Sequence, residues 1–546
     1  MNRKITILLS ALLATATGMA STLAGNDTIN RMVLVESTYN PIVVGAVKRN
    51  FIPEAMEPSM KKESIVYADE AMPLARFERT PQQAKGTAIA TSKSLPGYFH
   101  LGFGNRNNIS GLAAYKQDFG QSGALTIGAH IDGWNGNIRL DEGKWSSRFY
   151  DMGIGSRYDL QLGRMRLGAY LDAERYTFNY LTLGHFDATA GYANTQRSGN
   201  VDAGVSLDGN FKEHYYYNVK GGYANYSQDS HLGSEGRNVE GHLYLLASLG
   251  KDLYEWGKAS VDLRADWLVY KGLPGYSNYS SLGVTPSWDY AYDNFQFKVG
   301  MNLDLMTRMG AAVQVSPHCR VTYTPSEMYS AELLIDGGRK LPAFGYLHAL
   351  SPYWSTTAQL TPSYTFLNAR LAGNARIMEG LHAHLGGGYK VIDNALFCTA
   401  MDSAGVMFSN IVGHDAQLIY ADADISYIYK DVASVSATTA YYHWMVRGYH
   451  GLLAYTPQWD AHVKARARLM KGLYAHTDLR FVAYSAVGKG QREASAIDLS
   501  LGIHYAMNAK LSLFLDGHNL LNCSYPRFAG YSSQGINVLA GAVFKF

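Results

Sequence analysis

The sequence predicts an all-β protein: a transmembrane antiparallel β-barrel of about 22 strands (about 20–22) with an extended amino-terminal segment. Three observations carry this prediction. The chain ends in a strand with one apolar face, and charged residues recur at every second position inside long strand-like runs. Glycine and tyrosine are abundant, at 55 and 40 of 546 residues. A barrel whose outer face meets lipid and whose inner face meets water requires such a pattern.

The last stretch of the chain, 535–546, alternates strictly. Its apolar face consists of Ile536, Val538, Ala540, Ala542, Phe544 and Phe546. Its other face is small and mixed, with Gly535, Asn537, Leu539, Gly541, Val543 and Lys545. Successive side chains of a strand point to opposite faces, so the stretch predicts a strand with one lipid-facing side. For this stretch alone, a buried edge strand of a soluble protein stays the alternative.

Upstream runs show the same alternation, with charged residues on the second face. Clear examples are 164–174, 258–269, 419–429, 461–470 and 473–484. In 461–470, Ala461, Val463 and Leu469 oppose Lys464 and Arg466. Charges repeated at period two exclude a sandwich core, and no helical period is present to cover the apolar faces as a second layer. A barrel with a wet lumen therefore fits best.

Composition excludes several other classes. Charged residues make up 17%, mean hydropathy is −0.15, and no run of 18 apolar residues exists, so transmembrane helices are not expected. Net charge is +3, and +1 without Arg3 and Lys4, which gives no case for nucleic-acid binding. Cys319, Cys398 and Cys523 lie far apart, which predicts neither a metal nor a redox motif. We expect no cofactor.

Two segments precede the barrel. Residues 1–24 predict a secretory signal peptide, with Arg3 and Lys4 before a short apolar stretch and small residues around Ala24. Residues 25–95 are punctuated by prolines and charged runs, which predicts an extended segment that lies in the periplasm or inserts into the lumen. The barrel is expected over 96–546.

The strand number follows from the turns, because bacterial barrels have short periplasmic turns and long outer loops. Short turns are predicted near 120–123, 161–163, 210–214, 250–255, 293–295, 324–327, 378–380, 430–432, 470–472 and 507–510. Outer loops are predicted at 136–144, 182–193, 272–284, 339–361, 400–414, 447–457, 488–494 and 523–534, with a shorter one near 307–309. Ten turns pair twenty strands, and a first strand at 96–105 and a last at 535–546 make about twenty-two. Both termini then lie in the periplasm.

A barrel of this width would leak small molecules if it were empty. The lumen must therefore be filled by loops that fold inward, by residues 26–95, or by a partner protein. The sequence leaves these three alternatives open.

The carboxyl end resembles the barrels of TonB-dependent receptors. The residues that carry the resemblance are Asn519, Leu520, Leu521, Asn522, Tyr525, Gly530, Tyr531, Gln534, Gly535 and the terminal Phe546. The sequence Asp336-Gly337-Gly338 before an aromatic loop is similar to a Bacteroidetes-type branch of that family. The resemblance covers about 96–546 and implies an outer-membrane barrel of a Gram-negative bacterium. Family members carry a much longer amino-terminal plug domain, so the chain resembles a plug-less relative. Asp27-Thr28-Ile29 with 32–35 is only faintly similar to a TonB box.

Two sets of candidate functional residues follow. Basic residues expected to face the lumen could attract anionic solutes: Arg164, Arg166, Lys258, Arg264, Lys464, Arg466, Arg468 and Arg480. Acidic residues share these faces, so cross-strand pairing is the alternative. The loop 339–361 carries Phe344, Tyr346, His348, Tyr353 and Trp354, which either contact a sugar, peptide or surface protein or pack into the mouth of the barrel.

The predicted function is a passive or partner-gated transport barrel for small solutes. The alternative is a non-transporting subunit or scaffold of an envelope assembly complex that docks a periplasmic partner through residues 26–95. A surface protein is a further possible partner. No catalytic motif is present, so we do not expect an enzyme. Outer-membrane lipid and the barrel-insertion machinery are further expected partners, the latter reading the aromatic end at Phe544 and Phe546.

Overall fold

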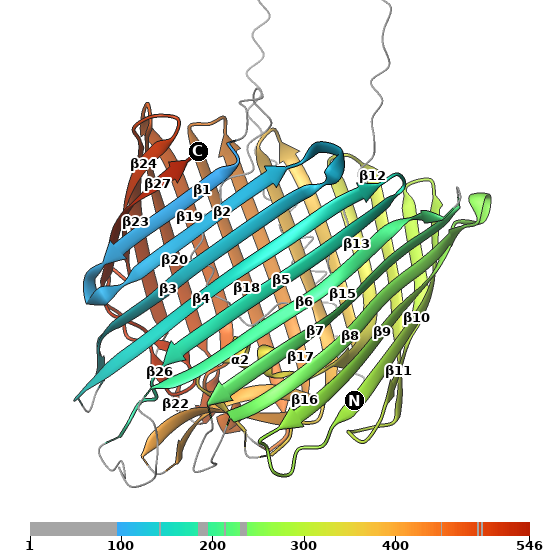
Figure 1. Ribbon diagram of the computed structural model, residues 1–546, viewed down its shortest axis with the longest axis horizontal. Coiled ribbons are helices and arrows are strands. Elements are labelled where there is room, and N and C mark those ends of the chain that lie inside the picture. The colour runs from blue at the N-terminus through green and yellow to red at the C-terminus, as the bar shows by residue number, and fades with distance from the viewer. Residues whose placement is uncertain are drawn as a thin grey trace, which may run out of the picture. The chain divides into compact units, whose positions relative to one another are not determined.

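A computed structural model describes residues 95–546 except 141–142, 184–194, 212–213, 230–236, 357, 404, 449, 489–490 and 493–494. The predicted signal peptide and all but the last residue of the predicted 25–95 segment lie outside the described residues. Within the described part, one antiparallel sheet closes on itself (Figure 1). The sheet has 23 strands, of which the two-residue β14 only pairs in parallel with β17. The other 22 form the barrel, which confirms the predicted architecture and strand number.

The first half of the barrel consists of β1 (Gly97–Gly104), β2 (Ile109–Asp118), β3 (Ala124–Leu140), β4 (Gly143–Leu162), β5 (Met165–Phe178), β6 (Gln196–Phe211), β7 (Tyr215–Asp229), β8 (Arg237–Asp252), β9 (Lys258–Lys271), β10 (Tyr279–Tyr292) and β11 (Phe295–Met306). The second half consists of β12 (Val313–Ser326), β13 (Tyr329–Lys340), β15 (Ser363–Met378), β16 (Leu381–Ser403), β17 (Val406–Tyr429), β18 (Ala433–Val446), β19 (Pro457–Met470), β20 (Leu473–Tyr484), β23 (Ala496–Ala506), β24 (Leu511–His518) and β27 (Asn537–Lys545).

Short elements lie in the connections. They are the helix α2 (Phe344–Leu350), the strands β14 (Trp354–Ser355), β21 (Ala486–Gly488), β22 (Gln491–Arg492), β25 (Pro526–Phe528) and β26 (Tyr531–Ser532), and the 3-10 turns η1 (Asn105–Asn107), η2 (Gly120–Ser122), η4 (Tyr254–Trp256) and η5 (His450–Leu453). No helix among the described residues is long and apolar enough to cross a membrane.

The closing seam joins the first and last strands. Tyr98 pairs with Lys545 and Gly104 with Leu539, and the Gly97 amide donates to the Phe546 carbonyl at 2.9 Å. All ten predicted short turns lie between consecutive strands at the end where β1 begins and β27 finishes. We call this the turn end and the opposite one the loop end.

Two predicted outer loops are wrong. Residues 136–144 and 400–414 mostly continue strands, so β16 and β17 run for 23 and 24 residues. Alternation does not stop where a hairpin leaves the membrane, so the pattern alone cannot mark that boundary. A third loop, 272–284, is shorter than predicted because β10 already begins at Tyr279.

The outer face carries the apolar alternation. Leu371 is 63% and Leu385 68% exposed, whereas their sequence neighbours point inward. At the turn end, outward aromatic residues form a band that includes Phe211, Tyr254, Trp256 and Tyr292. A second band, nearer the loop end, includes Tyr223, Trp267, Phe366, Tyr441 and Trp459. The strand from Lys258 to Trp267 extends over about 30 Å, or about 23 Å along an axis tilted by about 40°, which matches an apolar belt of about 25 Å.

The last strand has two apolar faces. Val538 and Phe544 lie outward, as predicted, but Leu539 and Val543 are buried inside against Phe514. Asn519, from the family-like motif, shapes the loop before this strand. Its side-chain amide donates to the carbonyls of Cys523 at 2.8 Å and Gln534 at 2.7 Å.

Candidate functional site

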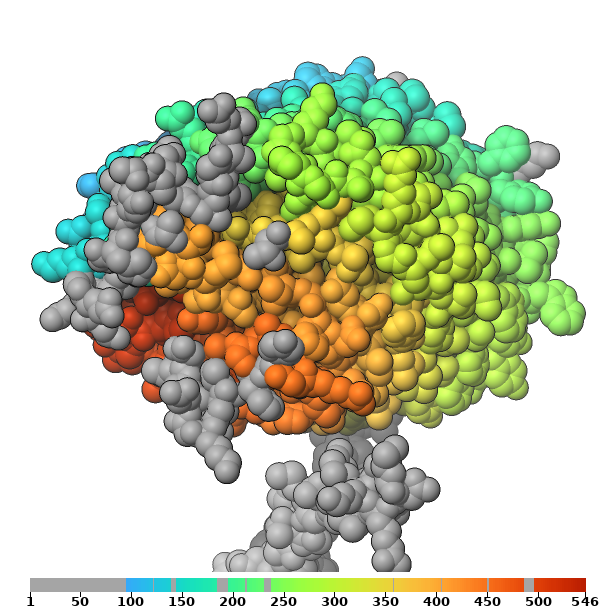
Figure 2. Space-filling view, turned by 90° about the horizontal axis from the view of Figure 1, so that it is seen from below, coloured from blue at the N-terminus to red at the C-terminus, as the bar shows by residue number. Residues whose placement is uncertain are grey.

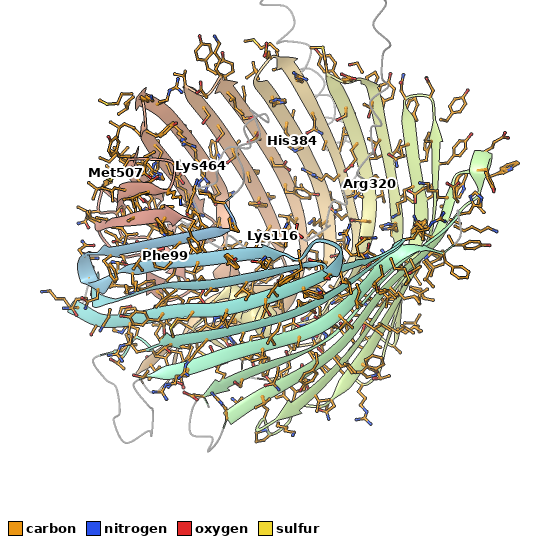
Figure 3. The ribbon with its side chains drawn as sticks, turned by 45° about the horizontal axis from the view of Figure 1, so that its top comes forward. Phe99, Lys116, Arg320, His384, Lys464 and Met507 are labelled. Carbon is orange, nitrogen blue, oxygen red and sulfur yellow. The ribbon has the colours of Figure 1, made fainter. Side chains whose placement is uncertain are left out.

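The inner wall of the barrel is charged, and most of the predicted basic residues lie beside carboxylates. Figure 3 shows His384 and Lys464 on this wall. Nitrogen–oxygen distances are 3.9 Å for Arg166 and Asp208, 2.9 Å for Arg264 and Asp266, 3.8 Å for Lys464 and Asp478, and 2.6 Å for Arg480 and Asp460, and Arg468 contacts Asp431. Acids therefore offset much of the basic charge in the lumen.

The remaining three predicted basic residues, Arg164, Lys258 and Arg466, have other surroundings. The Arg466 guanidinium sits 4.5 Å above the Tyr474 ring. Lys258 is exposed where β9 begins, at the turn end. Arg164 and Arg166 line a polar pocket of about 360 Å³ with Asp208, also at the turn end. An anion-selective field from these residues stays a prediction.

The strongest ionic cluster lies between β19 and β20. Arg480 donates to both carboxylate oxygens of Asp460, at 3.1 and 2.6 Å, and is only 8% exposed. His462 lies 3.2 Å from Asp460 and 3.5 Å from Asp478. A bidentate pair removed from water is rigid and costly to break. This part of the wall is thus a fixed polar surface.

Three segments close the loop end. The inner loop, residues 341–362, contains α2 and β14. The mouth hairpin, 395–412, is the far part of β16 and β17, and the final loop, 519–536, contains β25 and β26. We call the three together the lid. The yellow and orange segments extend across the loop-end face in Figure 2.

The inner loop binds the barrel wall through buried polar groups. The Phe344 amide donates to the Glu240 carboxylate on β8 at 2.8 Å, and Glu240 is 2% exposed. Nδ1 of His348 lies 3.0 Å from the Tyr226 hydroxyl, and its ring packs on Tyr176 with centroids 3.9 Å apart. These contacts fix α2 inside the barrel near the loop end (Figure 1).

The mouth hairpin reaches across to the wall that β5 forms. The Met407 amide donates to the Leu181 carbonyl at 2.9 Å, and the Leu183 amide donates to the Gly405 carbonyl at 2.8 Å. Thr182 and Val406 form the isolated antiparallel bridge between these bonds. A segment far along the chain therefore pairs with the connection after β5 and bridges the opening.

The final loop holds the other two segments together. Tyr531 stacks on Tyr353, with centroids 3.7 Å apart and planes 9° apart, and its hydroxyl donates to the Met407 carbonyl. The Ser409 hydroxyl donates to the Ala529 carbonyl at 2.7 Å and accepts from Ser351 at 2.8 Å. Trp145, Phe178 and Phe408 complete an apolar cluster around these rings. The lid is packed like a protein core.

The aromatic residues predicted for ligand contact are part of this packing. Phe344, His348, Tyr353 and Trp354 are each no more than 7% exposed, and Tyr346 is half-buried, with the Lys340 ammonium 3.8 Å above its ring. Burial raises the pKa of the Tyr346 phenol to about 12, so it stays neutral. Of the two alternatives left open by the sequence, the structure places these side chains in the mouth. In the described part, inward-folded loops fill the loop end.

Sequence reasoning missed the residues that receive the lid, chiefly Glu240, Tyr226 and Leu181. Each looks like an ordinary position of an alternating strand or its connection, and only tertiary contact distinguishes it. Among the described residues, no group of three or more His, Cys, Asp or Glu side chains is arranged to hold a metal ion.

Comparisons with known proteins support the fold. No protein-family model matches the chain, and no curated protein sequence matches it. Among solved structures, the FrpB iron transporter from Neisseria meningitidis (F3-3 variant) has a TM-score of 0.63 at 13% identity, covering 84% of this chain and 82% of that chain. A mutant of the ferric enterobactin receptor PfeA from Pseudomonas aeruginosa gives 0.61 at 11%, covering 82% and 80%. The copper transporter OprC gives 0.60 at 12%, covering 84% and 81%. The chain therefore has the fold of the 22-stranded outer-membrane barrels of TonB-dependent receptors.

Proposed function

We propose that the protein is a partner-gated transport barrel for small polar solutes, closed at rest by its own lid. The observation that carries the proposal is the interlocked mouth, in which Phe344, Tyr353 and Met407 each contact a different part of the wall or final loop. A passive pore needs an open mouth, whereas a gated one needs a seal that can be released. We therefore favour gated transport over passive diffusion.

The orientation belongs to the proposal. Short turns face the periplasm in bacterial barrels, so the turn end and both ends of the barrel sequence would lie there. The lid would then face the cell exterior, and the partner that releases it would act from the periplasm. The predicted extended segment 26–95, as a docking arm, and the use of TonB remain proposals of the same kind.

The solute class is suggested only by the lumen and by related folds. Mixed, paired charges such as Arg480 with Asp460 suit polar solutes of either sign. The names of the compared structures mention copper, iron and ferric enterobactin, so metal complexes are the first solutes to test.

Planar-bilayer conductance tests the proposal. The purified full-length chain is expected to be almost silent, and a variant with 342–361 replaced by a short glycine–serine linker is expected to conduct steadily. A matched control replaces the turn-end connection 253–257, between β8 and β9, in the same way and should stay silent. If the variant without the inner loop is also silent, the transport proposal is wrong. Envelope proteins that co-purify with the full-length chain but are lost without 26–95 would then support the assembly role.

A further inference from the structure

One wall of the barrel carries a row of irregularities at a single level. Extra residues interrupt the pairing at Gly337 in β13, at Phe366 in β15 and at 393–394 in β16. The pairs Gly338–Thr365 and Thr365–Ile392 show that these positions adjoin across the wall. A bulge bends its strand and increases the local twist. Three neighbouring bulges therefore form one bend line, which we call the crease.

The neighbouring strand parts from the wall at the same level. β12 pairs with β11 from Val313 onward, but its pairing with β13 begins only at Cys319. Residues 313–318 therefore lack the backbone ladder to β13 that the rest of β12 has. Beyond the crease, β13 continues directly into the inner loop. The end of β13 that leads into the inner loop therefore has no backbone pairing with β12.

Two side chains bridge the separated strands. The Asn302 amide donates to the Gly337 carbonyl at 3.0 Å and to the Ser316 hydroxyl at 3.2 Å. The Arg339 guanidinium donates to the Gln314 side chain at 2.9 Å and to the Ala311 carbonyl at 3.2 Å. Side-chain hydrogen bonds thus take the place of a continuous backbone ladder between β12 and β13 at this level. They can open without unzipping a strand.

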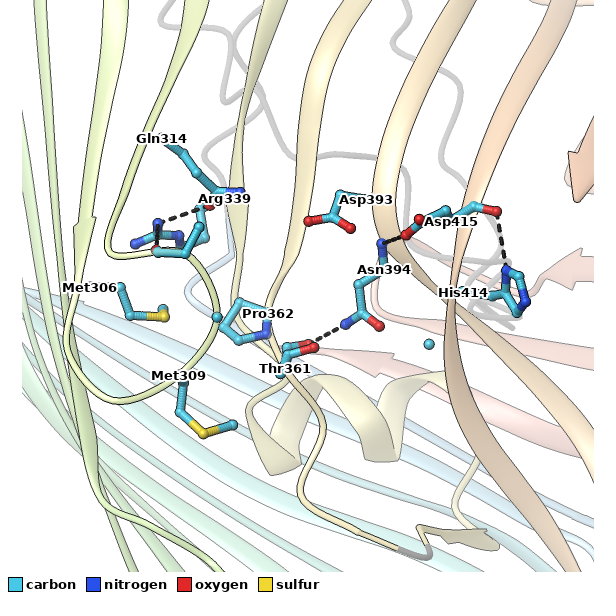
Figure 4. A pocket seen from close by; sticks show the side chains of 13 residues that line it. Met306, Met309, Gln314, Arg339, Thr361, Pro362, Asp393, Asn394, His414 and Asp415 are labelled. Atoms are coloured by element: carbon cyan, nitrogen blue, oxygen red, sulfur yellow. Dashed lines mark hydrogen bonds between the residues drawn. The ribbon is translucent and has the colours of Figure 1, made fainter. Parts of the chain in front are cut away.

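The sequence of the crease suits a bend. A Cβ on Gly337 would lie 2.3 Å from the Thr365 carbonyl oxygen, and Gly338 has a φ of 131°, where only glycine is unstrained. A cleft of about 340 Å³ opens beside this point (Figure 4). Arg339 and Pro362, at the two feet of the inner loop, both line it, together with Met309 of the β11–β12 connection. The feet of the lid therefore have space on one side.

We infer that the crease is the hinge of the moving part of the lid, which is the inner loop with the mouth hairpin. The inner loop and the mouth hairpin turn about it as one body, since β14 pairs with β17 and Ser351 bonds to Ser409. The contacts that break on opening are those to the wall, namely the Thr182–Val406 bridge and the Phe344–Glu240 bond, and the Tyr353–Tyr531 stack to the final loop, which stays in place. This inference rests on the proposed gating and specifies how the gate is regulated.

The bridging side chains give the first test. Arg339→Met and Asn302→Ala are each expected to speed amide exchange about tenfold or more in 395–412 and α2, because each loses bonds across the gap. Exchange in β5 to β7 should not change. Arg376→Met, at the turn end of β15, is the matched control. Arg339→Lys keeps the positive charge but removes the forked N–H donors of the guanidinium, so it tests the loss of those hydrogen bonds alone. A heat-dependent gel shift verifies that every variant is folded.

Two engineered disulfides give the second test, in a chain whose three native cysteines are replaced by alanine. Thr182→Cys with Val406→Cys joins the lid to the wall, and Ser351→Cys with Ser409→Cys joins two parts of the lid. Oxidation of the first pair is expected to abolish the exchange increase caused by Arg339→Met. Oxidation of the second pair should leave it intact.

The outcomes separate the hinge from transport. Equal suppression by both disulfides, or an Arg339→Met effect spread over the whole barrel, would overturn the hinge. If the inner loop and mouth hairpin respond as expected but the variant without the inner loop does not conduct, the hinge stands and the transport function fails.

Discussion

The buried carboxylate of Glu240 accepts a hydrogen bond from the Phe344 amide at 2.8 Å and so anchors the lid to the wall. Removing it by Glu240→Ala leaves that amide without its acceptor in an apolar site. We expect local destabilisation of α2 by about 1–3 kcal/mol, with the barrel intact. Hydrogen exchange of 344–350 measures this. Glu240→Gln keeps an acceptor oxygen and should cost less, and an equal loss in both variants would contradict the anchoring role.

Breaking the Arg480–Asp460 pair should destabilise the whole barrel. Arg480→Met leaves a mostly buried carboxylate beside His462, with an expected cost of about 3–5 kcal/mol in the free energy of unfolding. Urea titration of the protein in detergent measures it. The double variant with Asp460→Asn should recover part of the loss, because no unpaired charge remains. Full additivity of the two single costs would argue against coupling.

The apolar belt predicts a depth-dependent cost of charge. Leu371 points outward in the middle of β15, and Met378 lies at its turn end. Leu371→Arg should lower the stability of the membrane-inserted barrel by about 2–4 kcal/mol, and Met378→Arg by about 0–1 kcal/mol. Refolding titrations into lipid vesicles measure both. Similar costs at the two sites would show that the apolar belt is not centred at the level of Leu371.

The aromatic end is expected to act in assembly more than in stability. Phe546→Ala removes a ring that packs with Phe544, but the backbone bonds of the seam to Gly97 remain. The amount of assembled barrel in cells should fall, while refolding of the purified variant into vesicles stays near that of the unmodified chain. Tyr115→Ala, which removes a nearby outward ring, is the control. Equal losses in cells for both variants would remove the case for a specific signal.

The barrel was predictable because its physical cause is local. Lipid on one side and water on the other impose alternation on every strand, so Ala461, Val463 and Leu469 already separate from Lys464 and Arg466 in the sequence. Tight turns add glycines and polar residues between runs, which made the strand number countable. Both signals depend on neighbours along the chain.

The sequence predicted the loop 339–361 and offered packing into the mouth as one alternative, but it could not predict the mouth hairpin or the partners of the lid, because their cause is tertiary. The mouth hairpin alternates as the membrane strands do, and nothing in 395–412 marks the level where the wall bends inward. The partners of Met407 and Phe344, which are Leu181 and Glu240, lie more than a hundred positions away. Asp336-Gly337-Gly338 entered only as a family likeness, yet in the structure its glycines meet a steric and a backbone requirement.

The seam between β1 and β27 also has a consequence for biogenesis. The Gly97 amide finds its acceptor in Phe546, after the last strand, so the ring of backbone bonds cannot close before both β1 and β27 have been synthesised. Until then both terminal strands expose unpaired edges, which are templates for aggregation. Pairing partners more than 400 residues apart also makes closure slow compared with hairpin formation. The seam is therefore expected to be the last pairing to form, and until it forms the edges of β1 and β27 must be kept from pairing with other chains.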